Sequence, residues 1–162
     1  MRTTLVLIAL ALVLVNAAPV RGQDIGDPLL EQAGFAFPRA SKNRGIIKAQ
    51  LQFGIELEAK ALQVLEVAEG PESIKDIPLM IHQGYAALRV AGAGANWILG
   101  GSRFKDPLLE LFYQEIDRAM SQVRNGLGMA EGMANGEMRA RPAAVEHLRN
   151  AIQIASGAAE LL

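Results

Sequence analysis

Two histidines and two methionines are the side chains of this sequence best suited to bind a metal-containing cofactor, namely His82, His147, Met129 and Met133. Neutral imidazole is a ligand for haem iron, copper and zinc, and the thioether of methionine is a ligand for haem iron and Cu(I). The four-residue spacing of Met129 and Met133 places both on one face of a helix. We therefore predict a haem or copper site if the fold brings these side chains together. Otherwise the methionines fill gaps in a core.

Other kinds of chemical site find little support. The chain has no cysteine, which excludes disulfides, thiolate metal sites, covalent c-type haem attachment and a cysteine nucleophile. No Glu-x-x-His motif occurs, because Leu79 and Ala144 stand three residues before the two histidines, and this argues against a ferritin-like di-iron centre. The serines lie in no recognisable nucleophile context, and Glu56 and Glu58 point to different helix faces. We predict that the protein is not an enzyme. These residues do not identify a cofactor.

A second cluster of interest is basic. It consists of Arg39, Lys42, Arg44 and Lys48, with Arg103 and Lys105 further along the chain. No acidic residue lies between Glu31 and Glu56, so the cluster could bind a phosphate, an anionic polymer or lipid headgroups. The alternative is a solvated helix end whose charge is compensated elsewhere by acidic residues, which are Glu56, Glu58, Glu66 and Glu69.

Four segments with helical periodicity must position these side chains. They are expected from Ser41 to Glu69, from a start between Glu72 and Pro78 to about Leu99, from Asp106 to Asn135, and from Pro142 to Leu162. No stretch alternates with a period of two for long enough to indicate a strand. Because the connections are short, residues 41–162 are predicted to form an all-α, antiparallel up-down-up-down four-helix bundle. That topology would gather the histidines and methionines at one end and the basic residues at the other.

The second helical segment is unusually small in its middle, from Ala91 to Ala95. Glycine inside a helix costs up to about 1 kcal/mol relative to alanine, so a neighbouring helix or a ligand should approach closely here. With Tyr85 and Trp97 nearby, the small residues could leave a pocket for an apolar small molecule. Tight helix packing is the alternative.

The N-terminus has the composition of an export signal. Arg2 precedes an apolar run from Leu5 to Val15, and small residues at Val20 and Gly22 fit a cleavage site after Gly22. We expect a signal peptide over residues 1–22 and an extended leader over 23–40, which places the protein in the periplasm or outside the cell. An uncleaved anchor is the alternative, and membrane contact is expected only in that case.

Composition narrows the class of partner. Arg2 and Arg21 are the charged residues of the expected signal, so the rest of the chain is mildly acidic and has no overall attraction for nucleic acid. Aromatic residues make up only 5% of the chain, which argues against base stacking. We predict an exported, non-enzymatic helical bundle that binds a protein partner or self-associates in an assembly. The alternative is a bundle that holds haem, copper or an apolar small molecule.

Two structural features separate these alternatives. A partner-binding protein should leave an exposed apolar or Gly/Ala-rich stripe on the bundle surface. A cofactor protein should instead have His82 or His147 pointing inward.

Overall fold

The computed structural model describes residues 41–103 and 105–162, and 85% of this part of the chain is helical with no strand. The four α-helices are α3 (Arg44–Val67), α4 (Ile77–Gly101), α5 (Pro107–Ala134) and α6 (Arg141–Ala159). Two short 3₁₀ helices, η1 (Pro71–Ile74) and η2 (Met138–Ala140), lie in the connections. The prediction of an all-helical chain with four helices is confirmed, whereas the expected signal peptide and leader lie outside the described residues.

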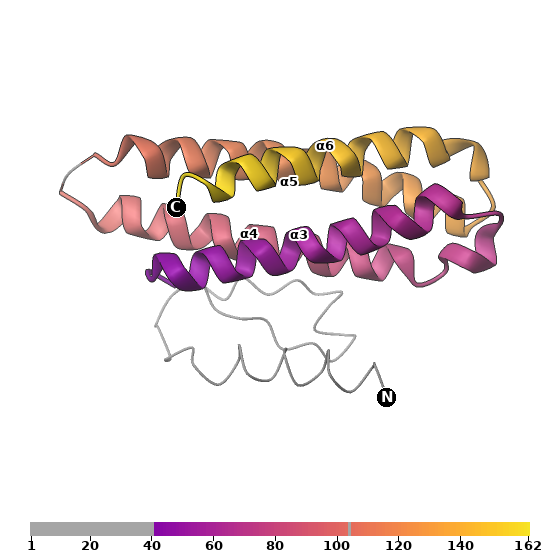
Figure 1. Ribbon diagram of the computed structural model, residues 1–162, viewed down its shortest axis with the longest axis horizontal. Coiled ribbons are helices and arrows are strands. Elements are labelled where there is room, and N and C mark those ends of the chain that lie inside the picture. Colours follow the sequence, from indigo (N-terminus) through magenta and orange to yellow (C-terminus); the bar gives the residue numbers. More distant parts are fainter. Residues whose placement is uncertain (1–40, 104) are drawn as a thin grey trace, which may run out of the picture.

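The helices lie side by side along one long axis (Figure 1). Contacts join α3 to α4, α4 to α5, α5 to α6 and α6 back to α3, so each helix has two neighbours. The α3–α4 and α5–α6 connections lie at one end in Figure 1, and the α4–α5 connection lies at the other. Within the described residues, no helix is both long enough and apolar enough to cross a membrane.

Local capping chemistry explains where the helices begin. The side chain of Asn43 accepts hydrogen bonds from the backbone N–H groups of Gly45 and Ile46, so α3 begins at Arg44 and not at Ser41 as expected. Asp106 caps α5 by accepting from the Leu109 N–H at 3.1 Å. Proline occupies one of the first two positions of each of the three later helices, where its missing N–H costs no helical hydrogen bond.

The helix ends differ more from the predictions. α3 ends at Val67, two residues before the expected Glu69, and Gly70 beyond it has an extended backbone with a φ of −161°. The turn after α5 does need a glycine, since Gly136 has a φ of +106° that other residues rarely adopt. α6 ends at Ala159, and Leu161 and Leu162 still pack against the core as partly buried residues.

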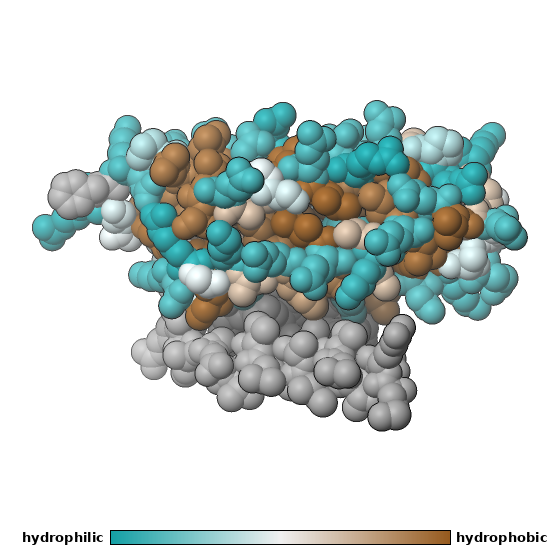
Figure 2. Space-filling model, in the orientation of Figure 1, coloured by the Kyte–Doolittle hydropathy of each residue, from teal (hydrophilic) through white to brown (hydrophobic). Residues whose placement is uncertain are grey.

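The core is built from aliphatic side chains of all four helices together with one large aromatic ring. Its largest fully buried side chains include Ile47, Leu51, Leu65, Ile81, Leu88, Leu109, Phe112, Ile116, Met133 and Leu148. Apolar side chains also reach the surface along the line between α3 and α6, where polar side chains border them (Figure 2). Apolar side chains therefore form the core of the bundle, and some of them remain exposed between α3 and α6.

Candidate functional site

The predicted cofactor ligands occupy different environments. Met133 is fully buried in the core, and Met129 is a partly buried residue packed against it. His147, on α6, has its Nδ1 atom 2.7 Å from Oε1 of Gln122 on α5. His82, on α4, lies against the ring of Tyr85, with the two ring centroids 6.5 Å apart.

The two histidines lie on different sides of α5. His147 contacts Gln122, whereas the neighbour of His82, Tyr85, accepts a hydrogen bond from Arg124 at 2.7 Å. Residues 122 and 124 are two positions apart on one helix and so do not face the same way. The structure therefore does not bring the two imidazoles together. In the described part of the chain, no group of three or more His, Cys, Asp or Glu side chains could hold a metal ion.

Two members of the predicted basic cluster make contacts within the protein. Arg44 forms a salt bridge with Asp106, which joins the start of α3 to the start of α5. The Lys42 ammonium lies 5.2 Å from the centre of the Trp97 ring on α4, within cation–π range. Lys48, Arg103 and Lys105 are exposed, and Arg39 lies outside the described residues. Arg44 and Lys42 thus connect the N-terminal end of α3 and the residues before it to α5 and α4, although all five described members of the cluster are exposed.

The small residues in the middle of α4 allow neighbouring segments to approach. A β-carbon at Gly92 would lie 3.2 Å from Cγ2 of Ile116 on α5. At Gly94 it would lie 2.6 Å from the Ser41 carbonyl oxygen and 2.9 Å from Cγ1 of Ile47. Tight packing, the second of the two expectations for this stretch, therefore accounts for both glycines.

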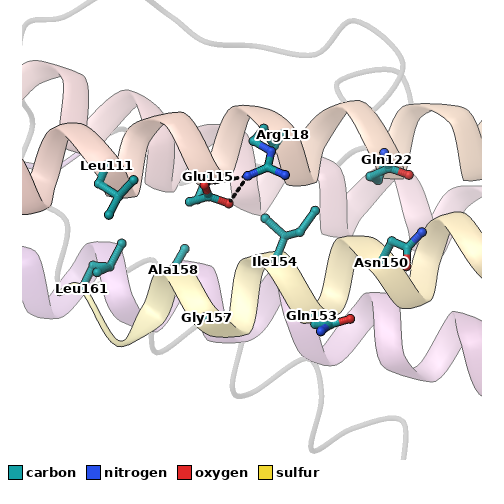
Figure 3. A pocket seen from close by; sticks show the side chains of 10 residues that line it. All are labelled: Leu111, Glu115, Arg118, Gln122, Asn150, Gln153, Ile154, Gly157, Ala158 and Leu161. Carbon is teal, nitrogen blue, oxygen red and sulfur yellow. Dashed lines mark hydrogen bonds and ion pairs between the residues drawn. The ribbon is translucent and has the colours of Figure 1, made fainter.

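A groove between α5 and α6 is the candidate binding site (Figure 3). Its volume is about 630 Å³, within the range of small-ligand and peptide pockets. α5 contributes Leu111, Glu115, Arg118 and Gln122, α6 contributes Asn150, Gln153, Ile154, Gly157 and Ala158, and Leu161 follows in the turn after α6. The α5 positions recur at steps of three and four residues, and the α6 side contributes single residues and adjacent pairs at the same spacing, so each helix presents one continuous stripe to the groove.

The groove has an apolar end and a polar end. Leu111 and Leu161 point toward one another near the start of α5, and Ile154 projects between the helices (Figure 3). Leu111 is 42% exposed, and Leu108, one turn earlier, is 55% exposed. At the other end, side chains with amide groups line the groove, namely Gln122, Asn150 and Gln153. An occupant can therefore bury apolar surface at one end and form hydrogen bonds at the other.

The charge within the groove is balanced. Nη1 of Arg118 donates to both carboxylate oxygens of Glu115, at 2.8 and 3.1 Å. Gly157 is exposed, and a β-carbon there would have no protein atom within 4 Å. The groove is thus electrically neutral, with open space above Gly157 where another backbone can approach.

Glu58 differs from the sequence expectation most clearly. It was named among the acids that compensate the basic cluster, but it is 1% exposed, and neither carboxyl oxygen has a hydrogen-bond partner among the described residues. Gln50 is similarly buried, at 3% exposure, and its amide has no such partner either. The spacing in the sequence indicated that Glu58 is buried, because it lies seven residues after Leu51 and seven before Leu65, and both of these are core residues.

The comparisons with known proteins give no family for this chain. No protein-family model matches it, and no curated protein or solved structure is significantly similar to it.

Proposed function

We propose that this chain is an exported binding protein whose antiparallel up-down-up-down bundle holds an amphipathic helix of a protein partner in the α5–α6 groove. The observation that carries the proposal is the pairing of an open floor at Gly157 with an apolar lining of Leu111, Ile154 and Leu161. Helix-in-groove recognition uses this combination, in which anchor side chains at i, i+3, i+4 and i+7 enter a hydrophobic groove.

The charge pattern of the groove selects among partners. Because Glu115 and Arg118 satisfy one another, an occupant gains little by placing a charge against them. The helix that fits should therefore carry leucine-like anchors toward the Leu111 end and short polar side chains toward the Gln122 end. A binding role is favoured over a catalytic one because the described groove residues include no nucleophile with an adjacent base.

The proposal that the protein is exported rests on its N-terminal sequence. The charged start, apolar run and small-residue exit over residues 1–22 support cleavage after Gly22. N-terminal sequencing of the protein from its native source should find Gln23 first. An intact Met1 or Thr3 in exported material would contradict this part of the proposal.

Site-specific photocrosslinking tests the groove. A photoreactive residue in place of Ile154 should give one crosslinked protein in the native source, and mass spectrometry should map the crosslink to an amphipathic helix. That helix, synthesised as a peptide, should bind the purified protein and lose at least tenfold in affinity with Leu111→Glu, since a buried unpaired charge is costly.

Leu79→Glu is the matched control for this experiment. Leu79 on α4 is 43% exposed and Leu111 is 42% exposed, so the two variants add the same charge at equally exposed leucines. The peptide should bind the Leu79→Glu variant as it binds the wild type. Equal losses for both variants, or crosslinks formed only to a second copy of this chain, would contradict the proposal.

A further inference from the structure

Two polar side chains lie within the contact between α3 and α4. Gln50, Gly54 and Glu58 are spaced four residues apart on α3, so they share one face of the helix. The glycine marks where the helices come closest, because a β-carbon at Gly54 would lie 3.1 Å from the Gly84 carbonyl oxygen on α4. A buried amide and a buried carboxyl therefore flank the point of closest approach.

The Glu58 carboxyl is packed against the backbone of α4. A β-carbon built at Gly84 would lie only 2.8 Å from Cδ of Glu58, so the acid occupies the space that a larger residue there would need. Burial raises the pKa of Glu58 well above its ordinary value of 4.5. Desolvation is the cause, and it acts because a charged carboxylate at this position would lose its contact with water.

No charged group on α3 or α4 offsets this burial in the described structure. On α3, Glu56 and Lys60 lie two residues before and two residues after Glu58 and are exposed. On α4, Tyr85 is directed to Arg124 of α5, and His82 lies against the Tyr85 ring.

The charged and titratable side chains of the other elements packed against α3 contact groups other than Glu58. On α6, Arg149 forms an ion pair with Glu66 near the end of α3, and Arg141 donates to the Ala68 carbonyl at 2.5 Å. His147 of α6 is directed to Gln122 of α5. Glu72 of η1 pairs at 3.9 Å with Lys75, the residue that follows η1, and both are exposed.

We propose that Glu58 is a proton-binding site that controls the contact between α3 and α4. With its proton, the carboxyl packs against Gly84 as a neutral group. Without the proton, the carboxylate must reach water, which it can do only if α3 separates from α4 along the face that carries Gly54. Rising pH therefore opens this contact while the α5–α6 contact stays closed.

Proton linkage sets the direction and size of the effect. The folded carboxyl holds its proton more tightly than the unfolded one, so the folded state is most favoured below pH 4.5, the ordinary pKa. As the pH rises above that value, the open form loses its proton first and becomes more stable relative to the closed form. The opening equilibrium constant should then rise by up to about tenfold per pH unit, the limit for one proton, until the pH passes the raised pKa.

Hydrogen exchange of the full-length protein between about pH 5 and pH 9, corrected for intrinsic exchange rates, measures this opening. In the wild type, protection of α3 and α4 amides should fall with pH relative to that of α5 and α6 amides. In Glu58→Gln, a neutral side chain of the same shape, the difference should stay constant with pH. Glu56→Gln, which removes an exposed acid two residues away, is the matched control and should behave like the wild type.

Two results would overturn the proposal. The first is pH-dependent opening that is identical in the wild type and Glu58→Gln, or that is uniform over the four helices. The second does not depend on any variant: carbon-13 NMR of the wild-type Glu58 carboxyl showing titration near its ordinary pKa of 4.5. The NMR measurement decides the question even if Glu58→Gln does not fold.

Discussion

The carboxyl of Glu58 lies over the α-carbon of Gly84, in the space that the β-carbon of any other residue would occupy. This contact joins a buried acid of α3 to a glycine of α4, and both are removed from solvent. The glycine is therefore required by its neighbour across the helix contact and not by its own backbone conformation, since the positive-φ glycine of the described chain is Gly136.

Gly84→Ala should destabilise the protein. The added methyl group must displace a carboxyl that is 1% exposed, and overpacking of this kind typically costs about 1–3 kcal/mol. Gly128→Ala on α5 is the control, because it adds the same methyl group at an exposed helical glycine with no atom within 4 Å of the new β-carbon. It should stabilise the protein by about 0.5–1 kcal/mol. Urea unfolding followed by circular dichroism measures both, and shifts in the same direction would contradict this interpretation.

Asp106 should make the protein sensitive to acid, in the opposite sense to Glu58. The hydrogen bond from the Leu109 N–H, aided by Arg44, holds the pKa of Asp106 below its ordinary value of 3.8. Its contribution to stability is therefore present above pH 3.8 and is lost as the pH falls through the lowered pKa.

The test is Asp106→Asn, which keeps an oxygen that can cap α5 but removes the charge. Its urea midpoint should fall less than that of the wild type when the pH is lowered from about 5 to about 2. Asp117→Asn removes an exposed acid from the same helix and serves as the control. An unchanged acid dependence in Asp106→Asn would show that the salt bridge with Arg44 and the cap do not respond to protonation.

Adjacent aromatic residues on α5 should differ sharply in their effect on stability. Phe112 is fully buried and Tyr113 is 38% exposed. Phe112→Ala removes a core ring and should lower the free energy of unfolding by about 3–5 kcal/mol. Tyr113→Ala should change it by no more than about 0.5 kcal/mol, as expected for a surface position. Thermal or urea unfolding of the two variants checks both values, and similar losses would mean that the face of α5 is misassigned.

Lys42 should stabilise the start of α3 through its contact with Trp97. Lys42→Met keeps much of the side-chain stem but removes the ammonium over the ring, so stability should fall by about 0.5–1 kcal/mol. The emission of Trp97, the sole tryptophan of the chain, should shift at the same time. Lys48→Met, at an exposed position of α3, should change neither quantity. If both variants behave alike, Lys42 acts only through its net charge.

Local signals predicted most of the helix boundaries. Asp106-Pro107 starts α5 as expected, because capping and proline geometry depend only on neighbouring residues. The expected end of this helix at Asn135 is one residue from the observed end at Ala134, and the turn that follows contains Gly136 with its positive φ. The start of α3 was missed by three residues, because Ser41 and Asn43 are both good caps and only the fold decides which one is used.

The candidate groove could be predicted only in part. Helical periodicity predicted the segment that forms α5, and Leu109, Phe112 and Ile116 recur on its buried face at steps of three and four residues. It did not show that Leu111 and Leu161 face one another across the groove, because that requires the rotation of α5 against α6 (Figure 3).

Sequence alone determined that this chain forms four helices and which residues share a face of each, because helical periodicity and capping are local properties of the backbone. Only the tertiary structure decided which faces meet. It buried Glu58 against Gly84 while leaving Glu56 in solvent, and it placed His82 and His147 on different sides of α5. The physical reason is that a face becomes a core, a groove or a surface only when another helix, rotated by a particular angle, packs against it.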